Sequence, residues 1–312
     1  MSKPGIILAA EPGHRKAAII AARELERRGF PHLLCPYDYG LPEGEWISNV
    51  TEAYDALSLS TAILQATHAI HVGTGISVTY MRHPADVAAA ASFNHEISDG
   101  RFTLGLGSGV DEFLQRFGVQ PERPLAHMRS YVERLRASAS RQPLPPILIA
   151  AVRPRMIRLA CEIADGPLGA NWALSSMPAI LEAIPAERRQ HVTVGNVAPA
   201  WITDDRGEGL AFMRRFLGLH MRLANFRSYF AEAGYESEAA RALAAIEAGD
   251  DAGVEAAIPE RMADDIGIFG TRSQIRDKVE AWQAQGVTLT ISTLLTIKDQ
   301  PAAVLRASEL FD

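Results

Sequence analysis

Two glycine-rich segments could let a flat or phosphorylated ligand come close to the backbone. Gly73-Thr74-Gly75 ends an apolar run that begins at Ala69, and Gly107-Ser108-Gly109 ends a second run that begins at Arg101. Glycine has no Cβ, so the backbone there is open to a ligand. Ligands of parallel α/β folds bind at the carboxyl ends of the strands. We therefore predict one site that contains both segments; the alternative is two tight turns without ligand contact.

Binding of a phosphate is indicated by Ala150-Ala151-Val152-Arg153. These residues precede Pro154 and the apolar stripe of a helix. Free N–H groups at a helix start attract anions, and Arg153 would neutralise one. Gly270 and Thr271 also precede a helix, which predicts a second phosphate contact. For both segments the alternative is a bare strand–helix connection, with Arg153 in solvent.

The histidines and cysteines predict no metal site. His68 and His71 have a spacing that metal ligands can have, but they lie where a strand begins, far from the predicted ligand site. Cys35 and Cys161 are the only two cysteines, too few for a structural zinc site. Both fall in apolar stretches, so we predict buried thiols in a reducing cytoplasm rather than a disulfide.

Short apolar runs alternate with helical patterns along the whole chain, which favours parallel strands joined by helices. The predicted strands are residues 5–10, 32–35, 69–76, 101–107, 147–151, 167–171, 191–200 and 287–294. Eight such units predict an α/β fold, a (β/α)₈ TIM barrel that forms one domain over residues 1–312. The alternative is an open doubly wound sheet, but no Gly-x-Gly-x-x-Gly turn follows the first strand.

Residues 204–265 carry no strand signal and predict a helical excursion after the seventh strand. We expect this insertion to drape over the C-terminal face, since long insertions are usually lids or partner surfaces. We expect helix breaks at its glycines, Gly218, Gly234, Gly249 and Gly253.

Helix boundaries are marked elsewhere in the chain. Pro84 and Pro154 suit the first turn of a helix, and Gly29 and Gly286 suit the position after a helix end. Thr271 to Gln274 reads as a capping box.

The composition limits the partners. The chain has 312 residues, 47% of them hydrophobic and 22% charged, with a formal net charge of −6. No long basic run is present, so nucleic acid is not an expected partner. No apolar stretch approaches the roughly 20 residues of a membrane span, and the first apolar run is too short for a signal peptide. We therefore expect a cytoplasmic protein with a small-molecule substrate.

Five segments occur in an order that is familiar from one family. They are THAIHVGTG from Thr67, Tyr80-Met81-Arg82-His83-Pro84, the string from Ser98 to Gly109, the stretch from Pro146 to Gly166, and Gly270-Thr271 with Gly286-Val287. Together they resemble the luciferase-like family of flavin- and deazaflavin-dependent barrel enzymes. The Arg-His-Pro string resembles the methylene-tetrahydromethanopterin reductase branch of that family.

The resemblance implies a cofactor and a reaction. The family binds FMN or the deazaflavin coenzyme F420 at the C-terminal mouth of the barrel, and the Arg-His-Pro match favours F420. It implies an oxidoreductase that transfers a hydride to or from a small organic substrate. One alternative is an FMN-dependent monooxygenase that uses reduced flavin and O₂; another is a non-catalytic flavin-binding member. The family habit is a homodimer, for which helices over 52–66 and 84–97 are candidate surfaces.

The resemblance also implies roles for cofactor-binding residues. Gly75–Ile76 matches the position of a non-prolyl cis peptide that backs the middle ring; the alternative is an ordinary trans bond. Gly107, Ser108 and Gly109 would lie beside the ring or its ribityl chain.

Two departures from the family pattern concern acid–base chemistry. Asp38 matches the acidic position after strand two, which a His usually follows, but here Tyr39 follows. Glu11, at the mouth of strand one, could take the acid/base role instead. The alternatives are a loop-capping Asp38 and a solvated Glu11. The acid expected after the strand-four glycines is replaced by Val110, with Asp111 one place later.

Overall fold

Eight parallel strands close on themselves at the centre of the molecule, in a computed structural model that describes residues 2–10, 13–37, 55–121, 123–139, 141–293 and 300–312. The strands are β1 (Gly5–Ile7), β2 (His32–Cys35), β3 (His71–Thr74), β5 (Phe102–Gly107), β6 (Ile147–Ala150), β7 (Pro167–Ala170), β8 (Gly195–Ile202) and β10 (Thr288–Ser292). Each pairs with the next, and β10 pairs with both β8 and β1. The predicted TIM barrel is confirmed, and the open sheet is excluded.

Two further strands lie beside the barrel. β4 (Ser77–Val78) follows β3 after a short interruption and pairs with β5. β9 (Ile268–Gly270) pairs only with the last three residues of β8, beyond the part that contacts β10. Neither was predicted, because two or three residues are too few to carry a periodic pattern.

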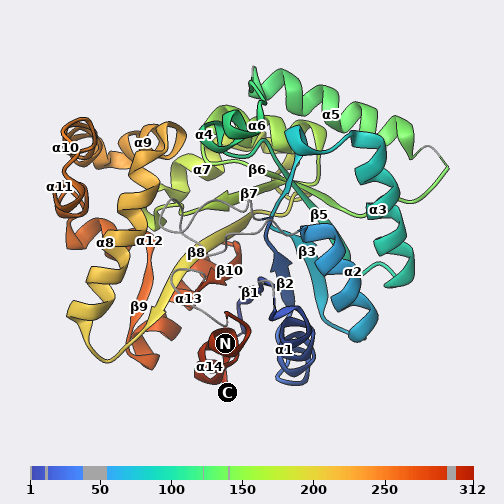
Figure 1. The fold of residues 1–312 in the computed structure, drawn as a ribbon, viewed down its shortest axis with the longest axis horizontal. Helices are drawn as coiled ribbons and strands as arrows, with labels where there is room; N and C mark the ends of the chain where they lie inside the picture. Colours follow the sequence, from blue (N-terminus) through green and yellow to red (C-terminus); the bar gives the residue numbers. More distant parts are fainter. Residues whose placement is uncertain (1, 11–12, 38–54, 122, 140, 294–299) are drawn as a thin grey trace.

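Helices alternate with the strands and surround them (Figure 1). They are α1 (Arg15–Arg27), α2 (Ala56–Ala66), α3 (Pro84–Ile97), α4 (Asp111–Leu114), α5 (Pro124–Ser138), α6 (Pro154–Ile163), α7 (Met177–Ala183), α13 (Arg272–Ala284) and α14 (Gln300–Ser308), with short turns η1 (Thr79–Met81), η2 (Gln115–Phe117), η3 (Leu174–Ser176), η4 (Ala186–Arg188) and η6 (Glu309–Phe311). The predicted boundaries hold: α3 and α6 start with proline, and Thr271 forms a capping box with Gln274.

The excursion after β8 is helical, as predicted, and gathers on one side of the barrel, coloured yellow to orange in Figure 1. It consists of α8 (Arg206–Arg222), α9 (Ala224–Phe230), η5 (Ala231–Tyr235), α10 (Glu236–Glu247), α11 (Asp251–Ala256) and α12 (Glu260–Ile266). Gly234 and Gly249 interrupt helices, with φ of +95° and +68°. The breaks expected at Gly218 and Gly253 are wrong, since both lie inside helices. Gly218 faces α11, where a Cβ would lie at an ordinary contact distance of 3.5 Å from Val254.

The barrel interior is filled by a small apolar cluster that is separate from the larger core under the helices. Its buried members are Ile7, Leu34, Leu148 and Leu168, with Ile76 and Val197 packed against them. At the amino-terminal end of the strands the interior becomes polar. There the His32 ring fills the space beside Gly5, and His32 Nε2 lies 2.8 Å from Thr290 Oγ1.

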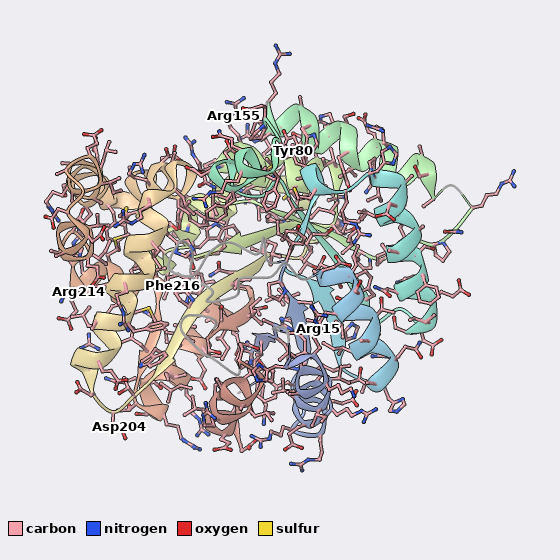
Figure 2. All side chains as sticks on the ribbon, in the orientation of Figure 1. Arg15, Tyr80, Arg155, Asp204, Arg214 and Phe216 are labelled. Carbon is pink, nitrogen blue, oxygen red and sulfur yellow. The ribbon has the colours of Figure 1, made fainter. Side chains whose placement is uncertain are left out.

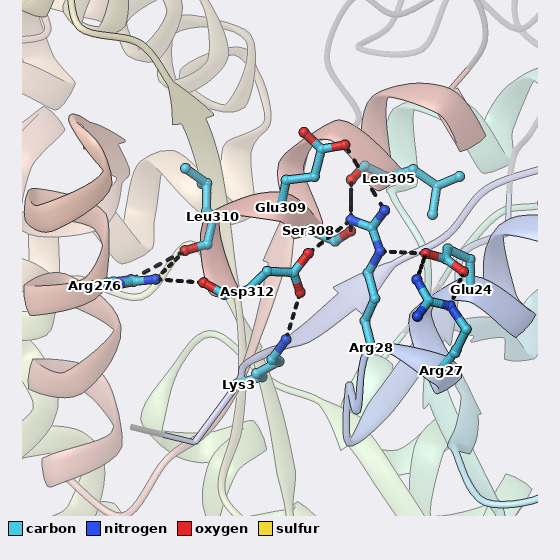
Figure 3. A network of polar contacts seen from close by, with 10 residues as sticks. All are labelled: Lys3, Glu24, Arg27, Arg28, Arg276, Leu305, Ser308, Glu309, Leu310 and Asp312. Atoms are coloured by element: carbon cyan, nitrogen blue, oxygen red, sulfur yellow. Dashed lines mark hydrogen bonds and ion pairs between the residues drawn. The ribbon is translucent and has the colours of Figure 1, made fainter.

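A polar network ties the two chain ends together (Figure 3). The Arg28 guanidinium donates to Glu24 Oε1 at 2.7 Å, to Ser308 Oγ at 2.8 Å and to the Leu305 carbonyl at 3.2 Å. Asp312 accepts a hydrogen bond from Lys3 at 3.0 Å, so residue 312 is bonded to the segment just before β1. These contacts hold α14 against α1.

Two simpler expectations can be compared with the structure. Cys35 and Cys161 are free, buried thiols, as predicted. In the part of the chain that the structure describes, no helix is long and apolar enough to cross a membrane.

We expect His32 to make stability fall with acidification. Burial, and then the charge of His71, lower the pKa of His32 from 6.5 to about 4. As the pH falls below 6.5, His32 is therefore protonated in the unfolded chain but stays neutral in the folded chain. This difference in proton binding lowers the free energy of unfolding. Between pH 7.5 and 5.0 we expect H32Q to lose about 1–2 kcal/mol less unfolding free energy than wild type. Urea denaturation at both pH values measures this difference; H68Q, at an exposed histidine, should behave as wild type, and an unchanged pH dependence in H32Q would contradict the assignment.

Candidate cofactor site at the mouth of the barrel

A cavity of about 270 Å³, here called the inner cavity, lies at the carboxyl ends of the barrel strands. Its walls come from the ends of β2, β3, β5, β6, β7 and β8 and from α9. Its lining residues are Tyr37, Gly75, Ile76, Val78, Ser108, Gly109, Val110, Ala150, Ala151, Val152, Leu168, Gly169, Ala170, Val197, Asn225 and Phe226. The structure thus brings together Gly75, Ile76, Ser108, Gly109 and residues 150–152, all of which the sequence predicted as ligand contacts.

Ile76 lines the inner cavity and also packs on the apolar cluster that fills the barrel interior, so it forms part of the cavity floor. The Gly75–Ile76 peptide is cis, at the position that the sequence predicted. The Ile76 side chain extends over β5, where its Cδ1 lies 2.1 Å from the point that a Cβ on Gly107 would occupy. Gly107 was predicted to lie beside the ligand, but it does not line the cavity. Its lack of a side chain instead makes room for Ile76, so Ile76 is the residue that a ligand would touch.

Side-chain hydrogen bonds near Ile76 connect η1 to β5 and α5 to η1. Thr79 Oγ1 donates to the Gly107 carbonyl at 3.2 Å. His127 Nε2 lies 3.0 Å from the same hydroxyl, whose single proton is already used, so His127 must be the donor. The His127 ring stacks on Tyr80 with centroids 3.7 Å apart. Burial, and then the charge of Arg134, lower the pKa of His127, which favours the neutral ring with its proton on Nε2.

The inner cavity is mostly apolar. Among its described lining residues the only titratable side chain is the Tyr37 phenol, and the other polar side chains are Ser108 and Asn225. Small residues predominate at the strand ends, so backbone forms much of the wall. Such a surface suits a flat ring held by contact and a few hydrogen bonds rather than a charged group.

A second cavity of about 470 Å³, here called the outer cavity, continues from the inner one. Both are lined by Ser108, Gly109, Ala150, Val152 and Asn225. The outer cavity adds charged side chains, which are Asp111, Arg153, Arg155 and Glu232. In the view of Figure 2, Arg155 and Tyr80 are both labelled in the upper part, whereas Asp204, where the excursion begins, lies at the lower edge.

The start of α6 borders the outer cavity, as the phosphate prediction requires. Arg153 is the residue before Pro154 and its side chain does not cap the helix. The N–H groups of Met156 and Ile157 already donate to the Arg153 carbonyl, at 3.0 and 3.1 Å, which leaves the Arg155 N–H in the first turn. The anion-binding capacity of this helix start is therefore smaller than its position suggests.

Arg153 has a partner that the sequence did not reveal. Its Nε lies 3.1 Å from each carboxylate oxygen of Glu232, and its terminal nitrogen also donates to Glu232. This hydrogen bond raises the pKa of Arg153. Arg153 is half-exposed to solvent, as the alternative expected, but it is also paired with Glu232, and this ion pair joins the barrel to the excursion.

Gly270 and Thr271 lie away from the other predicted contacts. Neither lines the inner or the outer cavity. The Thr271 N–H donates to Gln274 Oε1 at 2.9 Å, so the capping box already satisfies this helix start. The second phosphate contact was inferred from a helix start alone, and a helix start capped by its own side chains has less to offer an anion.

The two predicted acid/base residues, Glu11 and Asp38, lie outside the described residues, so their roles stay predictions. Tyr37, directly before Asp38, borders the inner cavity. Asp111 lines the outer cavity, and burial, followed by the charge of Glu112, raises its pKa.

Two lining residues that the sequence did not predict belong to α9. Asn225 and Phe226 wall the inner cavity although they are more than 50 residues from any other lining residue except Val197. Nothing in their local sequence marks them, because their position depends on how the excursion packs.

Comparison with known proteins adds independent information. The sequence matches the family described as luciferase-like monooxygenase over residues 4–289. It is 25% identical, over 280 residues, to a 5,10-methylenetetrahydromethanopterin reductase of Archaeoglobus fulgidus, covering 79% of this chain and 83% of the relative. It is also 25% identical, over an alignment of 333 residues, to a putative coenzyme F420-dependent oxidoreductase of Mycobacterium tuberculosis, covering 91% and 92%.

Solved structures share the fold. A coenzyme F420 dependent tetrahydromethanopterin reductase from Methanopyrus kandleri superposes with a TM-score of 0.75 at 20% identity, over 99% of this chain and 96% of that one. The oxygenating constituent of a 3,6-diketocamphane monooxygenase of Pseudomonas putida, in complex with FMN, gives 0.69 at 15% identity, over 100% and 97%. These identities are too low to transfer a cofactor.

We expect G107A to obstruct the inner cavity. The new methyl group would lie 2.1 Å from Ile76 Cδ1 and 3.0 Å from Ala150 Cβ, so Ile76 must turn into the cavity. Ring affinity, followed by fluorescence with F420 and with FMN, should fall by about 10-fold or more. The double variant G107A/I76A removes the clash but also the contact that Ile76 makes with the ring, so it should recover only part of the affinity. Wild-type ring binding by G107A would contradict the assignment of Ile76 as the floor.

Proposed function

We propose a function from the premise that this chain belongs to the luciferase-like monooxygenase family. It is an oxidoreductase that uses coenzyme F420 for hydride transfer to or from a small organic substrate. The observation that carries the proposal is the inner cavity, an apolar chamber at the strand ends with the Gly75–Ile76 cis peptide at its floor and a charged outer cavity beside it.

The described residues fit a ring that carries a phosphate. Ile76 would support the ring from below, and Ser108 and Gly109 would lie at its edge, because they line both cavities. Val152, Arg153 and the start of α6 would hold the phosphate in the outer cavity. When bound, F420 supplies a ring carbon that accepts or donates a hydride.

In this reaction the residues of the chain would orient the ring and the substrate, exclude water from them and transfer a proton. Leu168, Val197 and Phe226 are apolar walls that restrict the access of water to the ring face. Among its described residues the inner cavity is lined by no carboxylate or guanidinium, and its one titratable side chain is Tyr37, so we assign proton transfer to carboxylic acids that follow strand ends in the sequence. In the sequence Asp38 directly follows Tyr37, which lines the inner cavity, and Glu11 follows the end of strand one; these are the proposed acid/base residues.

F420 is preferred over FMN because the relatives at 25% identity include an F420-dependent oxidoreductase by name, and because of the Tyr80-Met81-Arg82-His83-Pro84 string. Arg82 itself does not reach the cavity, since it pairs with Asp55 at 3.0 Å and with Asp86 at 2.6 Å. The second candidate function is an FMN-dependent monooxygenase, which the fold shared with an FMN-bound monooxygenase supports.

Cofactor titration tests the proposal. We expect purified protein to bind F420 at least about 10-fold more tightly than FMN, measured by the fluorescence of each ring. The variant V197W places a large side chain in the inner cavity, so it should abolish the binding of both cofactors. Its circular dichroism spectrum would show that it folds. Tighter binding of FMN would support the monooxygenase, and binding of neither would sink the cofactor assignment.

Asp38 and Glu11 can be separated by conservative variants. We expect D38N to lower the rate of hydride transfer by about 10²–10⁴-fold, a range typical of the loss of a general acid or base, while ring affinity stays near that of wild type. E11Q is the matched variant. If replacing one of these carboxylates by its amide removes one limb of the pH–rate profile, that residue is the one that carries the proton. Normal rates and profiles in both variants would contradict the assignment.

A further inference from the structure

One ion pair crosses the outer cavity and joins the barrel to the excursion. Arg153 lies directly before α6 and Glu232 lies in η5, and both line the outer cavity. The side chains are 48% and 43% exposed, so both charges are in contact with water. The pair therefore closes part of the outer cavity without being buried in it.

The turn that carries Glu232 is irregular. η5 is a π-helical turn between α9 and α10, and Gly234 within it has φ +95°. Such turns interrupt helices and often mark functional segments. Glu232 thus borders the outer cavity from a segment that lacks regular α-helical geometry.

Other contacts hold the excursion in place independently of Arg153. Tyr229 Oη accepts from the Ala173 N–H at 2.7 Å, and Tyr235 Oη donates to Asp265 at 2.6 Å. Neither Tyr229, Tyr235 nor Asp265 lines the outer cavity. Loss of the Arg153–Glu232 pair would therefore free Glu232 without detaching α9.

We propose that Glu232 is a resident counter-ion of Arg153 that the anionic group of a ligand displaces, so the outer cavity selects ligands by their negative charge. This inference rests on the proposed function, since the ligand is a ring with a phosphate. A phosphate can take both hydrogen bonds of the guanidinium fork in place of the carboxylate. Arg155 lines the same cavity and, among the described residues, has no ion pair, so it adds charge that Glu232 does not neutralise.

The balance of charges makes the displacement feasible. Exposed ion pairs are weak, so Glu232 holds Arg153 only loosely against a competitor. Once released, the half-exposed Glu232 carboxylate is hydrated and is not left buried and unpaired. A ligand without a negative charge cannot replace the Glu232 carboxylate as the partner of Arg153, so the ion pair stays intact when such a ligand binds.

FMN and riboflavin, which differ by one phosphate, are suitable probes. We expect E232Q to bind FMN about 3- to 5-fold more tightly than wild type, which is the scale of an exposed ion pair, and riboflavin equally well. F420 and its phosphate-free ring should show the same contrast. D251N is the matched control, because it breaks the 2.6 Å Arg222–Asp251 pair in the same excursion but away from the outer cavity; it should change neither affinity.

The effect must pass through Arg153. In an R153Q background the E232Q substitution should no longer tighten FMN binding. Weaker FMN binding by E232Q, an equal change for FMN and riboflavin, or a gain that persists in R153Q would each overturn the proposal.

A probe without a ring separates this inference from the proposed function. Inorganic pyrophosphate at constant ionic strength should raise the melting temperature of E232Q more than that of wild type or D251N. This holds even if no ring binds, in which case the cofactor assignment fails but the anion site stands. Equal stabilisation of all three proteins would overturn the anion site.

Discussion

The interior of a closed barrel has a fixed volume, and this chain divides that volume between glycines on some strands and large side chains on others. Gly5 leaves room for His32, and Gly107 leaves room for Ile76, in each case with a distance near 2 Å between the missing Cβ and the intruding atom. Gly75 likewise faces Leu34, whose Cβ lies 3.0 Å from the missing atom. Because side chains are packed at nearly crystalline density, such exchanges fix where each one goes. The inner cavity begins where the side chains that fill the barrel interior end, and Ile76 belongs to both the interior cluster and the cavity lining.

That constraint also separates two environments at the mouth. Below and around the inner cavity the walls are apolar or backbone, whereas the charged groups Asp111, Arg153, Arg155 and Glu232 all belong to the outer cavity. A ring with a charged tail matches such a division, since burying an ionised group among apolar walls would be costly. The excursion completes both cavities, with Asn225 and Phe226 on the inner one and Glu232 on the outer one.

The barrel was predictable because its eight strands are short apolar runs separated by strong helix signals. The predictions erred where tertiary packing overrides local preference: Gly218 continues a helix because α11 packs on it, and β9 exists only as a partner of β8. Most of the predicted ring contacts do line the inner cavity, but Gly107 acts through Ile76. Arg153 was expected to face a ligand, yet its partner is 79 residues away in sequence, and no local pattern encodes such a pair.

The central claim, that a flavin-type ring rests on Ile76, can be measured by methyl NMR with isoleucine δ1 groups labelled. On addition of F420 the Ile76 methyl resonance should move strongly through the ring current, while that of Ile20, 62% exposed on α1, should not move. A bound ring that leaves the Ile76 resonance unchanged would contradict the account.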